Sequence, residues 1–190
     1  MIVAKRILPS KKRLGVHEKR LIDSLAAWFL KLGYDVIPHA RLNLAWGPVL
    51  SDIDLLAIKR GTVTVIEVKS ENDNLSRAAH QLDKIIDFVD YAFVATERMP
   101  RQWDHGKFGL IRIRDGEIEV IRFAQRLARR PTLDSILALP KSSLLRTAGI
   151  RETDRVLKDE VARTIFSTMR TKELRAYLKE EALCGNTFYH

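Results

Sequence analysis

The sequence contains a single cysteine, Cys184, among 190 residues. One cysteine cannot form a disulfide within the chain, and zinc sites built from several cysteines are excluded. The longest apolar runs, such as LIDSLAAWFLKLGY, are interrupted by charges, so no segment approaches the roughly 20 apolar residues that span a bilayer. The opening MIVAKRILPSKKR lacks the continuous apolar stretch of a secretory signal. We therefore expect a cytoplasmic protein with no membrane segment.

Apolar residues make up 46% of the chain, which is enough to build a hydrophobic core and argues against wholesale disorder. The length suits one domain of ordinary size with an appended helical piece. We find neither internal repeats nor a low-complexity tract. The net charge is +9, and such a positive field favours polyanionic partners such as DNA. Charge alone leaves open an ordinary basic protein that binds no nucleic acid.

The first half of the chain predicts a helix followed by three strands. Apolar residues recur at helical spacing over 14–32, and Gly33 is placed to end that helix. A strand is expected over 34–42, with Pro38 indicating an edge position or a bulge. After a loop, two strands are expected in the segment 52–70, joined by a turn at Arg60-Gly61.

The second half predicts one more helix, three strands and a helical end. A helix capped by Asn74 is expected over 71–90. An apolar strand over 91–97 and a hairpin over 108–123 follow, and after Pro131 only helical patterns remain. This order predicts an α/β fold with a mixed central sheet, helices on both sides, an extra β-hairpin and a C-terminal helical extension.

We place a core over 1–130 and the helical extension over 131–190. The longest helical pattern in the extension carries an apolar stripe of Leu157, Val161, Ile165 and Met169, spaced by four. Two interpretations of the stripe are open: it packs on the core, or it joins two chains. The second interpretation predicts a homodimer with two-fold symmetry, which we favour.

Charged residues interrupt the two apolar strands of 52–70. Because side chains alternate along a strand, Asp52 shares a face with Asp54, and Glu67 shares a face with Lys69. A tight turn at Arg60-Gly61 sets a register in which Asp54 lies opposite Glu67, and Asp52 opposite Lys69. Opposed carboxylates on neighbouring strands, about 5 Å apart at Cβ, repel each other. A cation between them would remove the conflict.

A divalent metal ion, Mg²⁺ or Mn²⁺, suits this arrangement, because Mg²⁺ takes a few carboxylate oxygens and keeps several waters. Asp54 and Glu67 are the candidate ligands, and the carbonyl of Val68 could add another. Lys69 could contact a metal-bound water or a developing phosphate charge. Glu18 lies on the buried face of the first predicted helix and could approach the same metal. These parts are sufficient for metal-assisted hydrolysis of a phosphodiester.

Simpler interpretations exist for the same residues. Asp54, Glu67 and Lys69 could form a surface-facing ladder of ion pairs, with Lys69 opposite Asp52. Glu18 could be an ordinary surface charge, and Asp52 could be a supporting acid or an alternative ligand. His17 and His80 have no metal-ligand spacing to another histidine, so neither is assigned to the site.

The segment SDIDLLAIK…IEVKS resembles motifs II and III of the PD-(D/E)XK nuclease superfamily, which has the restriction-endonuclease-like fold. The resemblance covers residues 14–96 and implies an α-β-β-β-α-β core. Carried over position by position, it implies Asp54, Glu67 and Lys69 as catalytic residues, with Glu18 from the first helix and Gln81 from the next. Asp54, Glu67, Val68 and Glu18 would hold the metal.

The match has two departures from the family pattern. Ile53 stands where the family name has proline, and Ile85 stands where a tyrosine often follows the glutamine. The opening RLGVHEKRLIDSLAAWFLKLGYDVI is also similar to archaeal Holliday-junction resolvases, whereas KSENDNLSRAAHQL looks more like small stand-alone nucleases of prokaryotes and their viruses. The loop NLAWGPVL and the helical extension make this chain longer than those compact resolvases.

The resemblance implies a Mg²⁺-dependent or Mn²⁺-dependent DNA endonuclease, selective for DNA structure and active in repair, recombination or viral DNA processing. No base-reading module such as a zinc finger is present in the sequence. The basic residues expected to contact phosphates are Lys11, Lys12, Arg13, Arg98 and Arg101, with Lys107, Arg129 and Arg130 as further candidates. The alternatives are an inactive nuclease fold that binds nucleic acid or regulates, and an RNA or tRNA nuclease.

Overall fold

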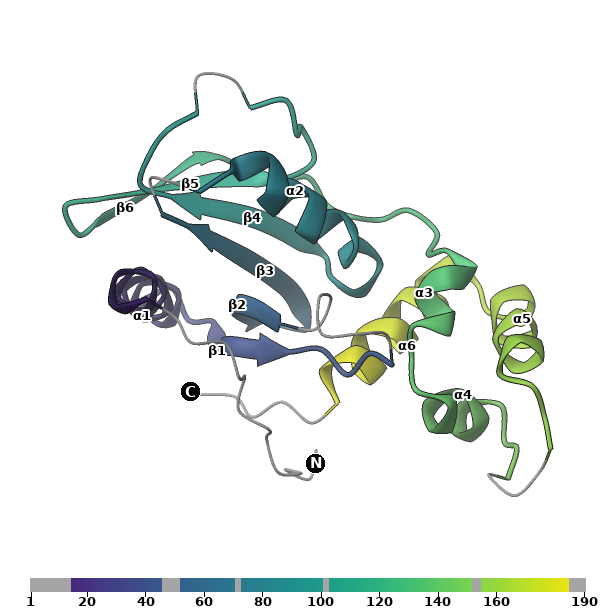
Figure 1. Ribbon diagram of the computed structural model, residues 1–190. Helices are drawn as coiled ribbons and strands as arrows, with labels where there is room; N and C mark the ends of the chain where they lie inside the picture. The colour runs from purple at the N-terminus through teal and green to yellow at the C-terminus, as the bar shows by residue number, and fades with distance from the viewer. Residues whose placement is uncertain (1–14, 46–51, 71–72, 101–102, 152–154, 185–190) are drawn as a thin grey trace.

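The computed structural model describes residues 15–45, 52–70, 73–100, 103–151 and 155–184. Within them, one six-stranded sheet has its strands in chain order (Figure 1). The strands are β1 (Asp35–Arg41), β2 (Asp52–Lys59), β3 (Thr62–Lys69), β4 (Tyr91–Thr96), β5 (Gly109–Arg114) and β6 (Glu117–Arg122). The helices are α1 (Val16–Lys31), α2 (Leu75–Asp83), the short 3₁₀ helix η1 (Ile86–Phe88), α3 (Leu133–Leu137), α4 (Lys141–Thr147), α5 (Lys158–Thr168) and α6 (Thr171–Leu183). The protein is a mixed α/β protein, as the sequence predicted.

The sheet combines antiparallel and parallel pairs. Strands β1, β2 and β3 form an antiparallel meander. The chain then crosses over through α2, so that β4 runs parallel to β3, and β5 runs parallel to β4. Strand β6 returns antiparallel to β5. The carboxyl ends of β3 and β4 therefore meet at one end of the sheet, and their amino ends meet at the other.

Each face of the sheet carries its own hydrophobic core. Helix α1 buries Leu21, Ile22, Leu25 and Phe29 against one face. Helix α2 covers the other face, across β3 and β4, and α3–α6 extend the same apolar core beyond one end of the sheet (Figure 1). In the described part of the chain, no helix is both long and apolar enough to cross a membrane.

Residues with positive φ stand at the helix end and at the tight turn that the sequence predicted. Gly33, with φ +76°, ends α1 in the left-handed conformation that suits a helix C-terminus. Arg60 and Gly61 both have positive φ, as a two-residue hairpin turn of type I′ requires. Pro38 lies in β1, which is an edge strand and tolerates a missing N–H donor. These three predictions are confirmed.

The predicted helix over 71–90 is too long. Helix α2 begins after its N-cap Asn74, as predicted, but ends at Asp83 and gives way to η1. Asp87 explains the break, because its carboxylate is buried and accepts from the backbone N–H of Thr132 at 2.9 Å and the hydroxyl of Ser135 at 2.7 Å. Contacts with residues more than 40 positions away thus override the local helical pattern, which could not reveal them.

The C-terminal helices dock at the amino ends of β3 and β4. Asp90 is buried and accepts from the backbone N–H of Val63 at 2.9 Å and from Nζ of Lys179 on α6 at 2.8 Å. Arg175 of α6 donates to the carbonyl of Val89 at 2.5 Å. Burial lowers the pKa of the Arg175 guanidinium, and the nearby Asp90 carboxylate opposes that change. The extension is therefore fixed to the end of the sheet opposite to Lys69.

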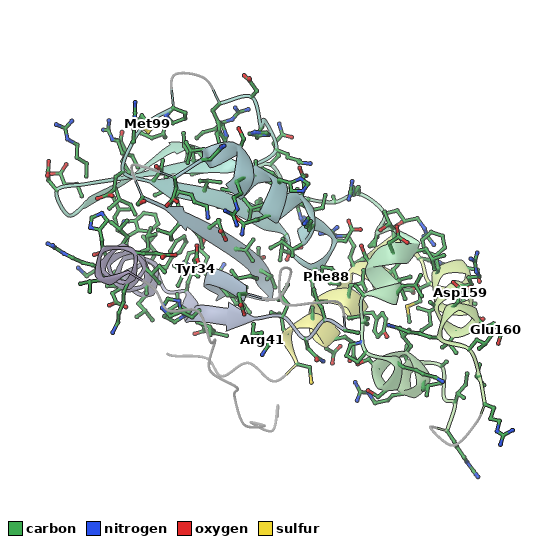
Figure 2. All side chains as sticks on the ribbon, in the orientation of Figure 1. Tyr34, Arg41, Phe88, Met99, Asp159 and Glu160 are labelled. Carbon is green, nitrogen blue, oxygen red and sulfur yellow. The ribbon has the colours of Figure 1, made fainter. Side chains whose placement is uncertain are left out.

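The apolar stripe of the extension is used within the chain. Val161 and Ile165 are buried in the same hydrophobic core as α2, whereas Leu157 is 66% exposed. Phe88 belongs to this core and lies where the sheet meets the C-terminal helices (Figure 2). Of the two interpretations of the stripe, packing on the core is the one observed. The stripe therefore no longer supports a homodimer, which stays a prediction.

Gly109 of β5 pairs with Phe93 of β4 and leaves no room for a side chain. A Cβ atom added there would overlap the Phe93 ring and lie 2.9 Å from the backbone N of Ala124. We expect Gly109→Ala to lower the free energy of unfolding by about 2–3 kcal/mol, because a ring and a backbone segment must move. Urea unfolding measures it. The control Gly15→Ala, where the added atom meets nothing within 4 Å, should change stability by less than about 0.5 kcal/mol. Equally small changes in both variants would contradict the prediction.

Candidate functional site

The β2–β3 hairpin has the register that the sequence predicted. Its ladder runs from Lys59 opposite Thr62, beside the turn, to Leu55 opposite Ile66. The turn fixes this register, because a two-residue type I′ loop leaves one way to pair the flanking strands. Asp54 and Glu67 follow next along the two strands, at the end of the hairpin far from the turn.

The ladder ends one pair before the two acids, which changes the predicted geometry. Instead of pairing directly with Glu67, Asp54 turns its carboxylate toward β3, and its Oδ2 accepts from the backbone N–H of Val68 at 2.9 Å. Asp52 pairs with Arg41 of β1, and the β2–β3 ladder ends before it, so its predicted position opposite Lys69 is not part of the ladder. A side-chain acceptor has taken the place of the backbone carbonyl where β2 and β3 separate.

Both acids are buried, and Glu67 is paired. Asp54 is 4% exposed and Glu67 is 5% exposed. The Nζ of Lys69 lies 2.7 Å from Oε1 of Glu67, and both side chains are largely shielded from solvent. The interpretation as a surface-facing ladder of ion pairs is therefore wrong for these residues. Burying two carboxylates and an ammonium group costs free energy unless each has a compensating partner. A cluster of this kind therefore indicates a functional site.

Glu18 lies in the first turn of α1, which packs on the face of the sheet opposite to α2. The side chain is half-buried. Its neighbour His17 contacts Glu97, with 2.6 Å between Nε2 and Oε2. Glu97 directly follows β4, whose last residue Thr96 is the parallel partner of Lys69. The contact therefore ties the start of α1 to the carboxyl ends of β3 and β4.

Sequence reasoning missed both partners of this contact. His17 lacks metal-ligand spacing to a second histidine, and the apolar pattern over 91–97 makes Glu97 the end of a strand. A usable signal existed in the order of the elements: an acid directly after β4 must lie beside the residues that end β3, since the two strands are parallel.

The structure describes two of the remaining candidate residues, Gln81 and Arg98. Gln81 lies in α2 with its Oε1 buried, and among the described residues that atom has no hydrogen-bond partner. Arg98 is exposed just beyond β4. The hydrogen bonds described for Asp54 and Glu67 join them to Val68 and Lys69. Lys11, Lys12, Arg13 and Arg101 lie outside the residues that the structure describes.

The donor set fits a hard divalent cation in its chemistry. Asp54 and Glu67 supply carboxylate oxygens, the Val68 carbonyl lies between Glu67 and Lys69 in the chain, and Mg²⁺ tolerates few protein ligands because it keeps several waters. Among described residues 15–45, 52–70, 73–100, 103–151 and 155–184, no three histidine, cysteine or acidic side chains form a metal-binding group. Asp54 and Glu67 are the two buried acidic ligands that the protein would offer, and Glu18 in the first turn of α1 is a further candidate.

Comparison with known proteins gives no functional assignment. No protein-family model matches the chain, and no curated protein matches it. Among solved structures, a protein of unknown function from Silicibacter pomeroyi is similar, with 17% sequence identity and a TM-score of 0.48. The match covers 86% of this chain and 92% of that one. A similarity at this level carries no argument about what the chain does.

Proposed function

We propose that the chain is a divalent-metal-dependent DNA endonuclease with a restriction-endonuclease-like core formed by α1, β1–β3, α2 and β4. The observation that carries the proposal is the buried group of Asp54, Glu67 and Lys69 where β2 and β3 separate. The order of elements and the D-x₁₂-E-x-K pattern support it through their resemblance to PD-(D/E)XK nucleases.

In this proposal Asp54 and Glu67 hold the metal, assisted by the Val68 carbonyl and by Glu18. The bound ion would supply Lewis-acid stabilisation of the phosphodiester and lower the pKa of a coordinated water. Lys69 places its ammonium group beside the acids, where it can donate to a non-bridging phosphate oxygen and orient the attacking water. Glu67 keeps that ammonium in place through the 2.7 Å contact. The net charge of +9 favours DNA as the substrate.

The ion pair between Glu67 and Lys69 also favours a second candidate function. The contact neutralises both groups without any metal, and so permits a nuclease fold that binds or regulates nucleic acid without turnover. Calorimetric titration separates the two candidates. Heat of binding with Mg²⁺ or Mn²⁺ supports the nuclease, whereas retained DNA binding without such heat supports the inactive module.

Cleavage assays with a Lys69→Ala variant test the nuclease proposal. Plasmid, single-stranded DNA, four-way junctions and structured RNA are incubated with Mg²⁺ or Mn²⁺. We expect the wild-type protein to cut DNA, and Lys69→Ala to lose about 10²–10³-fold in rate, because a preorganised positive charge is lost.

Lys59→Ala is the matched control, because Lys59 lies at the opposite end of the same hairpin and donates to the Leu32 carbonyl of the α1 terminus. It should retain cleavage within about threefold, as a surface substitution away from the site does. Equal cleavage by wild type and Lys69→Ala would indicate contamination or a wrong site. Cleavage of RNA but not DNA would move the proposal to the RNA nuclease alternative.

A further inference from the structure

Strand β1 contains a left-handed residue in its middle. His39 has φ +53°, although the strand continues on both sides of it from Asp35 to Arg41. Residues other than glycine adopt this conformation uncommonly, and histidine, asparagine and aspartate are several-fold enriched among those that do. Such a conformation costs free energy and persists only where the surrounding structure enforces it.

The register of the β1–β2 ladder places His39 opposite Asp54 on the neighbouring strand. Pro38 pairs with Leu55 on one side, and Ala40 pairs with Ile53 on the other. His39 and Asp54 are the residues that lie between these two pairs, one on each strand. The strained residue and the buried acid therefore occupy the same step of the β1–β2 ribbon.

The ribbon exchanges its two faces at this step. Ile37 and Leu56, which pair with each other, face the α2 side, and Leu55 faces the α1 side. Regular alternation would then send Ala40 and Ile53 to the α1 side.

Instead, Ala40 and Ile53 are both buried on the α2 side. The reversal happens in both strands at the same place, between the pairs that flank His39 and Asp54. The left-handed residue of β1 lies at this step. Asp54 is released from the regular alternation, and its carboxylate reaches sideways to the Val68 N–H.

We propose that His39 is a positioning residue whose left-handed backbone turns the β1–β2 ribbon over and aims the Asp54 carboxylate at β3. The backbone of His39 has this role, and its imidazole ring does not. The proposal that His39 aims Asp54 is argued from the described geometry alone. The expected effect on metal binding rests on the proposed function. A strand without this reversal would leave Asp54 on a regular sheet face, away from the peptide that follows Glu67.

Four substitutions at position 39 test the proposal by their tolerance of positive φ. Glycine and asparagine accept the left-handed conformation, alanine accepts it less well, and β-branched valine resists it. The readouts are hydrogen exchange of the Val68 amide, followed by NMR, and binding of Mn²⁺ alone, followed by electron paramagnetic resonance.

We expect His39→Asn and His39→Gly to keep Val68 exchange and Mn²⁺ affinity within about threefold of wild type. His39→Val should speed Val68 exchange by about tenfold or more, because opening of the Asp54 contact becomes easier. It should also weaken Mn²⁺ binding by about tenfold, the usual cost of losing support for a metal ligand. If His39→Val does not fold, His39→Ala takes its place and should fall between asparagine and valine.

Two results would overturn the proposal. Unchanged Val68 exchange in His39→Val, or in His39→Ala if that replaces it, would show that the backbone conformation does not position Asp54. Losses in His39→Asn and His39→Gly as large as in His39→Val would assign the role to the imidazole. A wild-type protein that neither binds Mn²⁺ nor cleaves DNA would refute the proposed function, while the order of Val68 exchange rates would still decide the role of His39.

Discussion

Replacing Asp54 by asparagine is expected to reduce metal-dependent DNA cleavage by about 10²–10³-fold while the protein stays folded. The substitution removes the negative charge but keeps the shape of the side chain. The amide oxygen of asparagine can still accept from the Val68 N–H, which Asp54 Oδ2 does at 2.9 Å. Loss of activity would then reflect loss of a metal ligand and not collapse of the hairpin. Initial cleavage rates with Mg²⁺ and Mn²⁺, beside thermal unfolding curves, measure both effects.

Asp52→Asn is the matched control for this experiment. Asp52 lies two residues away on the same strand, but it is exposed and pairs with Arg41 of the edge strand β1. We expect it to retain cleavage within about threefold, as exposed positions away from a site do. The opposite pattern, with activity lost in Asp52→Asn and kept in Asp54→Asn, would make Asp52 the ligand and refute the site described above.

Asp54→Ala extends the comparison to stability. It removes both the charge and the acceptor of the Val68 N–H, which is buried. An orphaned buried donor costs about 1–3 kcal/mol, so Asp54→Ala should unfold at lower urea concentration than Asp54→Asn. Similar stability in the two variants would mean that the Asp54–Val68 bond contributes little to holding the open end of the hairpin.

The sequence predicted those parts of the site that depend on residues close together in the chain. The Arg60-Gly61 turn determines the register of β2 and β3, so it brings Asp54 and Glu67 to the same end of the hairpin. Alternation along β3 predicted that Glu67 and Lys69 share a face, and their side chains form an ion pair at 2.7 Å. The α/β class followed in the same way from the order of helical and extended periods.

Three features of the fold could not be predicted from periodicity. The reversal of the β1–β2 ribbon arises at His39, and no rule of alternation predicts a left-handed histidine inside a strand. Helix α2 stops early because Asp87 is engaged by Thr132 and Ser135, which lie more than 40 residues further along the chain. Asp90 similarly bonds to Lys179, 89 positions away. The early end of α2 and the docking of α6 each depend on a long-range partner that periodicity does not encode.

Asp90→Ala is expected to be among the most destabilising single substitutions, lowering the free energy of unfolding by about 3 kcal/mol or more. Its carboxylate, 5% exposed, holds the Val63 N–H of β3 and the Lys179 ammonium of α6 together. Removing it leaves a donor and a positive charge without their acceptor where the extension meets the sheet. Asp90→Asn keeps an acceptor for Val63 and should lose only about half as much. Urea denaturation gives the free energies, and trypsin digestion reports release of the C-terminal helices.

An exposed ion pair in the extension provides the control. Asp159 lies on α5 (Figure 2). It accepts from Arg163 at 2.6 Å, and both side chains are more than half exposed. Asp159→Ala should change stability by less than about 0.5 kcal/mol, because solvent screens an isolated surface pair. The contrast tests whether the extension is fixed by the Asp90 contacts or by apolar packing alone. A loss in Asp90→Ala no larger than in Asp159→Ala would show that the core around Leu174 and Leu178 of α6 is sufficient to hold the extension on the sheet.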